Sequence, residues 1–411
     1  MLKILVTIII SVLIVLFFNS CSNITDIDHG KNTIIVDIRG AELLRYDDII
    51  EDFDFEILDN HSEYLLSSNI VKWDISLEHN IIGFLDNRVQ KKLLLFSLHT
   101  GELVSYIDLV IRGNDWTAET FNDFEFVGDK VVVINDLISR MFEFNIDGSF
   151  NNVIDISEDW DFFEYSDKTK SFVYIKDDDV SCSAISYYDS KLQKHLLIDM
   201  ADMNEGCAPY PTPYEDKLTK SVITENILFM DPSWTKILSF NGTNWDTLDI
   251  VINEGSPEKY FGSMAKTNNV LERSELVFSM TNDLSTAYPI RKINETDDFI
   301  HLTVALENTF YWTFYDKKNN LSRTHKVLPD IRMTDIFPPY YDFYITSDTV
   351  GFYVLGEEVQ YAMSEKRLFD VNNYNDSVGY SLESLKIQID SLDLLNAVLF
   401  KAKLNIDRLL P

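Results

Sequence analysis

Residues 81–150 decide the fold. Residues 81–110 read IIGFLDNRVQKKLLLFSLHTGELVSYIDLV, and after a connector residues 124–150 read FEFVGDKVVVINDLISRMFEFNIDGSF. Each half contains an apolar strand that ends in an acidic or amide turn, then a second strand, then a turn that contains glycine. Apolar runs bounded by Gly, Asn and Asp are typical of β-hairpins. Because the hairpin recurs, this stretch indicates a repeat architecture of antiparallel strands.

Further copies of this unit follow along the chain. Each pairs an apolar strand with a strand rich in Phe, Tyr and Val, which suits a half-buried sheet. The copies span residues 171–200, 226–252, 299–328 and 344–363, and shorter strand candidates lie at 33–38, 53–58 and 70–75. Six units fit a propeller, whose four-stranded blades leave only short edges. We therefore predict an all-β fold over residues 32–411, a six-bladed β-propeller of four-stranded antiparallel blades with short helical insertions.

The helical insertions are expected in two segments. Ser256 is a suitable N-cap and the next residue is proline, which favours a helix over residues 256–268. Residues 381–395 place leucine and isoleucine at helical spacing, so we expect this stripe to pack on the body, with partner binding as the alternative.

The predicted ring implies positions for the C-terminal segment and for the acidic turns. Residues 397–404, AVLFKAKL, form a strong strand candidate, which should pair with strands from the other end of the chain or complete the sixth unit. The turns at Asp86, Asn135, Asp177 and Asp231 should fall at equivalent places on one end of the ring.

The N-terminus is expected to be a targeting segment. Lys3 precedes an apolar run at 4–18, which has the length of a signal-peptide core and is short for a membrane span. The run ends in FNSCS, which resembles the lipobox of bacterial lipoproteins. This resemblance implies a signal peptide at 1–20, lipidation of Cys21 and a tether at 21–31. The alternative is an uncleaved signal anchor. Ser22 after the cysteine favours the outer membrane, and whether the body faces the periplasm or the exterior stays open.

The net charge of the chain disfavours some classes of binding partner. The chain of 411 residues has a formal net charge of −32, which argues against nucleic acid as a partner and disfavours docking of the body on anionic lipid. A solvated acidic surface is the simple interpretation of this charge. Oligomeric state is not predicted.

The motifs of common enzymes and metal sites are absent from the sequence. There is no phosphate-binding loop, dinucleotide fingerprint, zinc-protease motif or nucleophile elbow, and the histidines show no ligand spacing. We therefore assign no catalytic residue, no metal ligand and no cofactor. The run 177–179 could ligate calcium, but a plain acidic turn is the simpler interpretation.

After Cys21, only Cys182 and Cys207 remain. In an exported protein they can form a disulfide, and two buried thiols are the alternative.

Aromatic residues in loops are the candidates for contact with a ligand. Prolines stiffen two of these loops, and exposed aromatic rings can stack on sugars or anchor a protein partner. The alternative is that they cover the ends of the blades. The candidates are Trp116, Tyr210, Tyr214, Tyr340 and Tyr341.

Taken together, these features resemble a known family. The lipobox, the hairpin at 131–150, the connector IRGNDW at 111–116 and the tail NAVLFK at 396–401 are similar to those of six-bladed β-propeller lipoproteins of Gram-negative bacteria. Trp116 stands where these proteins tend to have glycine. The resemblance implies the fold and a cell-envelope location. It implies no catalytic residues, because the family has none established.

Two functions remain open from the sequence. The first is a non-catalytic, lipid-anchored binding or scaffold module of the cell envelope, with a protein or carbohydrate ligand. The second is a glycan-active enzyme that uses carboxylates of the central channel. The missing nucleophile and metal motifs favour the first. Carboxylates that converge in the channel with displaced pKa values would favour the second.

Overall fold

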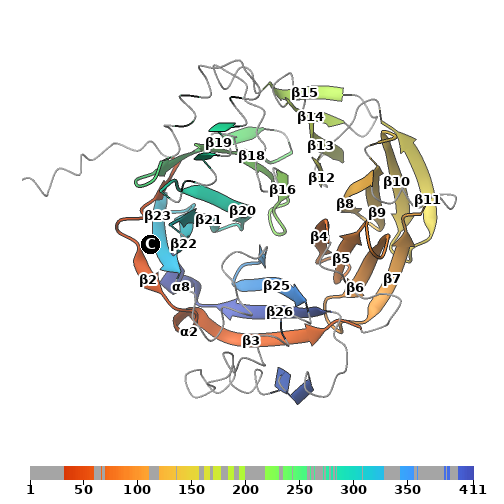
Figure 1. Ribbon diagram of the computed structural model, residues 1–411, viewed down its shortest axis with the longest axis horizontal. Coiled ribbons are helices and arrows are strands. Elements are labelled where there is room, and N and C mark those ends of the chain that lie inside the picture. Colours follow the sequence, from red (N-terminus) through yellow and green to blue (C-terminus); the bar gives the residue numbers. More distant parts are fainter. Residues whose placement is uncertain are drawn as a thin grey trace, which may run out of the picture. The chain divides into compact units, whose positions relative to one another are not determined.

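Strand β9 (Lys130–Asn135) shows why the chain folds as stacked sheets. Its residues Val131 to Ile134 are at most 1% exposed, and β5 (Ile81–Asp86) is buried at every position. A strand that is buried on both faces needs a neighbouring sheet on each side, as in repeat proteins. In the computed structural model the sheets provide these neighbours by standing around a ring (Figure 1). The described residues are 32–411 with gaps, the longest at 60–65, 111–119, 177–183, 200–217, 264–271, 328–342, 360–383 and 389–396.

The described strands form six sheets, which we number in chain order. Sheet 1 contains β4 (Lys72–Ser76), β5, β6 (Lys92–Ser97) and β7 (Leu103–Asp108). Sheet 2 contains β8 (Phe121–Val127), β9, β10 (Arg140–Asn145) and β11 (Phe150–Asp155). Sheet 3 contains β12 (Phe162–Ser166), β13 (Ser171–Lys176), β14 (Ala184–Tyr188) and β15 (Lys194–Asp199).

The remaining sheets include strands from the N-terminal part of the chain. Sheet 4 contains β16 (Leu218–Lys220), β17 (Ile227–Met230), β18 (Lys236–Phe240), β19 (Trp245–Ile252) and β1 (Thr33–Val36). Sheet 5 contains β20 (Tyr288–Glu295), β21 (Phe299–Leu306), β22 (Thr309–Asp316), β23 (Leu321–Val327) and β2 (Glu42–Leu44). Sheet 6 contains β24 (Tyr344–Ile345), β25 (Thr349–Leu355), β26 (Ala397–Leu404) and β3 (Ile50–Ile57). The chain is therefore an all-β propeller of mostly four-stranded antiparallel blades.

Sheet 6 closes the ring with strands from both ends of the chain. Strand β26 pairs on one side with β25 and on the other with β3, with Phe400 opposite both Phe352 and Phe55. The prediction for residues 397–404 is confirmed. Within the unit at 344–363, β24 and β25 form a short antiparallel hairpin, and the other partner of β25 is the distant strand β26. Val359, later in this unit, is helical and buried.

The glycines of the repeated turns are required by backbone geometry. Gly101, between β6 and β7, has φ +68°, and a Cβ there would collide with the carbonyl oxygen of Ile57 in sheet 6. Gly148, between β10 and β11, has φ +83°, and a Cβ would collide with the carbonyl oxygen of Tyr106 in sheet 1. Each turn thus packs its backbone against the outer strand of the preceding sheet, which only glycine permits. This contact explains why the motif recurs.

The acidic turns of the first two sheets lie at equivalent places. Asp86 and Asn135 each end the second strand of a sheet, and both are at most 1% exposed. The Oδ1 atom of Asp86 accepts the N–H of Val89 at 2.8 Å, and that of Asn135 accepts the N–H of Ile138 at 3.4 Å. Their side chains fix the turn. Asp177 and Asp231 lie outside the described residues.

Apolar clusters join neighbouring sheets. Among the described residues, separate clusters connect sheets 1 and 2, sheets 2 and 3, sheets 4 and 5, sheets 5 and 6, and sheets 6 and 1. Leu385, on the stripe predicted at 381–395, is helical, fully buried and part of the cluster of sheets 5 and 6.

The helices α2 (Tyr46–Ile49) and α8 (Ile406–Leu409) have four residues each. Most of the helix predicted at 256–268 falls outside the described residues. Within the described part of the chain, no helix has the length and hydropathy to cross a membrane.

Candidate functional site: charged inner strands of the ring

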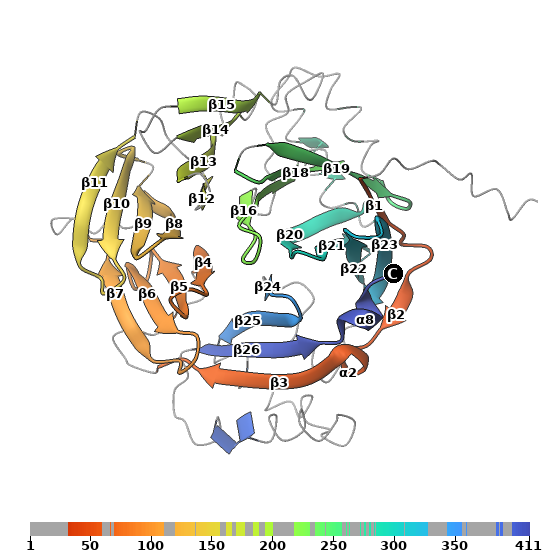
Figure 2. The same ribbon diagram turned by 180° about the vertical axis from the view of Figure 1, so that it is seen from behind.

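The first strands of sheets 1 to 4 carry charged side chains in otherwise apolar segments. These strands, β4, β8, β12 and β16, face the middle of the ring (Figure 2), and each contacts the next. In β8, FNDFEFV, the two acidic residues alternate with phenylalanine. We call the following set the central charge cluster: Lys72, Asp74, Asp123, Glu125, Glu164 and Lys220.

Two lysines hold the carboxylates of the cluster. The Lys72 Nζ atom lies 2.6 Å from Asp123 Oδ1, 2.9 Å from Glu125 Oε1 and 3.9 Å from Glu164 Oε1. The Lys220 Nζ atom lies 2.8 Å from Glu125 Oε2. Glu125 therefore accepts an ammonium group on each of its oxygens. These contacts connect strands that are 53 and 95 residues apart in the chain.

Asp123 also joins sheets 2 and 3 through the backbone. Its Oδ1 atom accepts the N–H of Phe124 at 2.8 Å, and its Oδ2 atom accepts the N–H of Phe163 at 3.1 Å. A carboxylate that accepts N–H groups from two neighbouring strands fixes their relative position. The cluster is thus a polar connection between the inner strands of sheets 1 to 4.

Burial and charge displace the pKa values of the carboxyl groups in opposite directions. Burial raises the pKa of Asp123 to about 6, although the charge of Lys72 partly offsets it. Burial would also raise the pKa of Glu125, but the ammonium groups of Lys220 and Lys72 outweigh it and lower this pKa to about 2. Burial and the negative charge of Glu125 raise the pKa of Glu164 well above its ordinary value.

The lysines stay charged. Burial alone would lower their pKa values, but the carboxylates around them raise the pKa of Lys72 and of Lys220 above the ordinary range. The cluster therefore contains two ammonium groups beside Glu125, whose pKa is lowered, and Glu164, whose pKa is raised. Two carboxyl groups in contact with opposed pKa values form a pair that can exchange a proton.

The exposure of the cluster limits its chemistry. The side chains of Glu125, Asp123 and Glu164 are 0%, 5% and 6% exposed, whereas those of Lys72 and Lys220 are 13% and 16% exposed. Both oxygens of Glu125 and both oxygens of Asp123 accept protein donors, and the more exposed groups of the cluster are the ammonium groups. The arrangement is suited to joining the sheets. Convergence and displaced pKa values, which the enzyme hypothesis requires, are also present.

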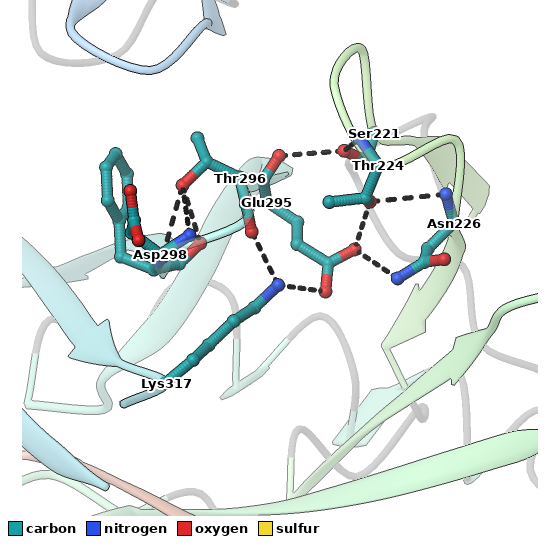
Figure 3. A network of polar contacts seen from close by, with 8 residues as sticks. Ser221, Thr224, Asn226, Glu295, Thr296, Asp298 and Lys317 are labelled. Carbon is teal, nitrogen blue, oxygen red and sulfur yellow. Dashed lines mark hydrogen bonds and ion pairs between the residues drawn. The ribbon is translucent and has the colours of Figure 1, made fainter. Parts of the chain in front are cut away.

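A second polar network joins sheets 4 and 5 (Figure 3). The carboxylate of Glu295 at the end of β20 accepts hydrogen bonds from Thr224 Oγ1 at 2.8 Å and Asn226 Nδ2 at 3.0 Å, and an ion pair from Lys317 at 2.7 Å. The hydroxyl of Ser221 donates to the Glu295 carbonyl oxygen at 2.7 Å. Because Ser221 follows Lys220 directly, this Glu295 network continues the central charge cluster into sheet 5.

Single polar contacts join sheet 5 to sheet 6 and sheet 6 to sheet 1. The side-chain oxygen of Asn294 in sheet 5 accepts the N–H of Ile345 in sheet 6 at 3.2 Å. Lys401 in sheet 6 donates to the carbonyl oxygen of Leu98, which follows β6 of sheet 1. Every pair of consecutive sheets from sheet 4 round to sheet 1 is thus joined by a polar contact in addition to apolar packing.

Two of the described histidines, His301 and His325, are buried in structural surroundings. His301 is fully buried, and neither ring nitrogen has a hydrogen-bond partner in the described part of the chain. It packs against Trp312, Phe314 and Phe343, and burial lowers its pKa to about 3, so it stays neutral. His325 contacts the Leu409 carbonyl oxygen at 3.1 Å. Within the described residues, no group of histidine, cysteine or acidic side chains is arranged to hold a metal ion.

The site residues named from the sequence lie outside the described residues. They are Cys21, Trp116, Cys182, Cys207, Tyr210, Tyr214, Tyr340 and Tyr341. Sequence reasoning missed the central charge cluster, although a signal was present. Asp123, Glu125 and Glu164 stand in strands rich in phenylalanine, where a charge must be buried and therefore paired.

Comparison with known proteins supports the fold. No protein-family model and no curated protein matches the chain. Among solved structures, it is similar to a candidate exported protein from Bacteroides fragilis, with a TM-score of 0.65 and 13% identity over 91% of this chain and 99% of the other. A member of the DUF4221 family from Bacteroides vulgatus matches with a TM-score of 0.46 and 8% identity over 87% of this chain and 97% of the other.

Proposed function

We propose that the chain is a non-catalytic, lipid-anchored binding or scaffold module of the cell envelope. The observation that carries this proposal is the state of the central charge cluster. Its carboxylates are buried and engaged by Lys72 and Lys220, so they stabilise the ring instead of presenting an acid and a base to a substrate. A rigid ring with variable connectors is a suitable support for binding loops.

The ring is proposed to have six blades. Support comes from the strands of the described residues, which fall into six sheets, and from β26, which completes the last sheet beside β3. On this basis residues 32–411 form one propeller.

The anchor is proposed to be Cys21, placed by lipidation on the outer membrane. The described ring begins near residue 33, which leaves residues 21–31 as the tether. The similarity to a candidate exported protein supports export. Cys21→Ala should move the protein from the membrane fraction to a soluble or unprocessed form. If the processed variant still sediments with lipid, the anchor is elsewhere.

Mass spectrometry without reduction tests the proposed disulfide between Cys182 and Cys207.

We propose that the ligand binds at the end of the ring where the connectors between sheets begin and end, and strand direction supports this choice. In an antiparallel four-stranded sheet, the start of the first strand, the turn between the second and third strands, and the end of the fourth strand share one end. The amide of Asn87 in that turn of sheet 1 donates to the carbonyl oxygen of Phe121 at the start of β8 at 2.7 Å. The strands that the connectors join therefore begin and end here, and all the aromatic candidates belong to connectors in the sequence.

Binding by this end can be tested with matched aromatic variants. Phe150 begins the fourth strand of sheet 2, so it lies toward the opposite end, and it is 60% exposed. On a panel of envelope glycans and in pull-down from envelope extracts, Trp116→Ala or Tyr340→Ala should weaken binding, whereas Phe150→Ala should not. Equal losses in all three variants would remove the proposed binding end.

The second candidate is a glycan-active enzyme that uses the Glu125–Glu164 pair. The observation in its favour is the opposed displacement of the two pKa values, which supplies an acid and a base in contact. Hydrolysis of a glycan that is lost in Glu164→Gln, with folding unchanged, would establish this candidate and overturn the first.

A further inference from the structure

We infer that His301 makes the joint between sheets 5 and 6 acid-sensitive, so that this joint holds while the imidazole is neutral and opens when the imidazole binds a proton. We call this joint the 5–6 seam. Its apolar cluster includes Trp312 and Phe314 of sheet 5 with Phe343 and Val350 of sheet 6. The inference goes beyond the proposed binding role, because it concerns how solution pH sets the closure of the ring, and it depends on neither the anchor nor the ligand.

The imidazole of His301 is enclosed by aromatic rings from both sheets. Its ring centroid lies 4.8 Å from that of Phe314 and 5.4 Å from that of Trp312, both on β22. It lies 5.2 Å from the ring centroid of Phe343, which precedes β24 of sheet 6. His301 is therefore part of the packing of the 5–6 seam, although it is a titratable residue.

The imidazole has no hydrogen-bond partner in these surroundings. His301 is 0% exposed, and within the described residues neither its Nδ1 nor its Nε2 atom has a hydrogen-bond partner. His325, on the same sheet, shows the usual arrangement of a buried histidine, because its Nε2 atom contacts the carbonyl oxygen of Leu409 at 3.1 Å. An imidazolium at position 301 would be a buried charge without a counter-ion, which is costly. The surroundings therefore favour the neutral ring.

The charged groups near His301 in the fold are engaged elsewhere. Opposite it on β20 is the neutral residue Asn294. On the same face of sheet 5, Arg323 pairs with Glu42 at 2.6 Å, and His325 contacts its carbonyl oxygen. Burial alone lowers the pKa of His301 to about 3. The strands of sheet 6 contribute apolar residues to the seam, which include Val350, Val398, Phe400 and Ala402.

A hydrogen bond beside His301 belongs to the same seam. The side-chain oxygen of Asn294 accepts the N–H of Ile345 in β24 at 3.2 Å. Because His301 is fully buried, water can reach a protonated imidazole only if the rings of Trp312 and Phe343 separate. This separation moves β24 away from sheet 5 and breaks the hydrogen bond. One proton thus acts on the packing of the seam and on its neighbouring polar contact.

The sign of the pH dependence follows from the two states of the chain. In the unfolded chain, histidine binds a proton with a pKa of about 6.5, whereas burial lowers the pKa of His301 to about 3 in the folded protein. Between these values the unfolded state binds more protons, so stability falls as the pH falls. Full stability is present above the unfolded pKa and is lost progressively toward the folded pKa. The 5–6 seam should therefore be firm at neutral pH and weaken in mild acid.

NMR of the full protein with labelled histidine tests the protonation state directly. The signal of His301, identified by its loss in His301→Phe or His301→Leu, should keep the chemical shift of a neutral imidazole from pH 7.5 to 5. A titration of this signal with a midpoint near 6.5 in the folded protein overturns the inference. If neither variant folds, a wild-type spectrum in which all seven histidines titrate overturns it equally.

Urea unfolding between pH 7 and 5 measures the effect on stability. His301→Phe removes the titrating group, so the folding equilibrium constant of the wild type should fall by up to about tenfold per pH unit relative to this variant below about pH 6.5. His99→Gln, at an exposed histidine, is the control and should follow the wild type in parallel. Parallel profiles of the wild type and His301→Phe would contradict the assignment to His301.

Hydrogen exchange at pH 7 and 5, corrected for the intrinsic rates, locates the opening. In the wild type, the amides of Ile345 and of β21 and β22 should lose more protection in acid than those of β5 and β9. His301→Phe should remove this difference. Equal losses in all six sheets of the wild type would show that acid does not act at the 5–6 seam.

Discussion

Replacement of Glu125 by glutamine should be the most damaging single change at the ring centre. Its carboxylate is 0% exposed and accepts Lys72 at 2.9 Å and Lys220 at 2.8 Å. Glutamine keeps the size of the side chain but removes the charge, so two buried ammonium groups lose their shared partner. Removing one partner of a buried ion pair costs about 3–5 kcal/mol, because the remaining charge is left uncompensated.

The assay is equilibrium unfolding in urea at pH 7, read by tryptophan fluorescence, with Glu143→Gln as the matched control. Glu143 pairs with Lys130 at 3.0 Å, but that lysine is 38% exposed, so the control should lose no more than about 1 kcal/mol. Since the pKa of Glu125 is lowered to about 2, its contribution is present above the unfolded pKa. The difference between wild type and Glu125→Gln should therefore shrink as the pH falls from about 4.5 toward 2. If Glu125→Gln costs no more than Glu143→Gln, the cluster does not hold the sheets together.

Three further changes test other parts of the fold. Gly148→Ala should cost more than Gly128→Ala in urea unfolding, because both have positive φ but only the Cβ at 148 would meet a neighbouring carbonyl oxygen, that of Tyr106. The difference should be about 1–3 kcal/mol, and equal losses would show that the close approach is unimportant. Glu295→Gln should lose about 1.5–3 kcal/mol, the usual range for hydrogen bonds to a charged group, and a stability equal to wild type would contradict the role of its network. A chain that ends at residue 396 lacks β26 and should show no cooperative unfolding transition by calorimetry, whereas a normal transition would refute closure by that strand.

The repeat was predictable because its signal is local. Strands β5 and β9 are apolar at nearly every position, and Gly101 and Gly148 mark turns whose backbone no other residue fits. Closure by residues 397–404 was also predictable, since a strong terminal strand needs a partner. In the unit at 344–363 the hairpin is β24 with β25, and the helical conformation of Val359 was not predicted, because a short apolar segment looks the same whether it forms a strand or packs as a helix.

The central charge cluster could not be assembled from the sequence. Its members come from four sheets, and the contacts join residues up to 95 positions apart. With 67 acidic residues in the chain, spacing alone does not reveal which of them meet. Charges inside phenylalanine-rich strands, such as Asp123 and Glu125, indicated burial, but only the ring geometry identifies Lys72 and Lys220 as their partners.

Hydrogen exchange of Lys72→Met tests most directly whether the central charge cluster joins the inner strands of sheets 1 to 4. Within the described residues, Lys72 is the lysine that contacts Asp123, Glu125 and Glu164 together, so its loss leaves the four buried acids of the cluster with one ammonium group, that of Lys220. The amides of β4, β8 and β12 should lose protection together, while those of β21 and β22 in sheet 5 stay protected. Unchanged protection in all three inner strands, in a variant that folds normally, would contradict the account.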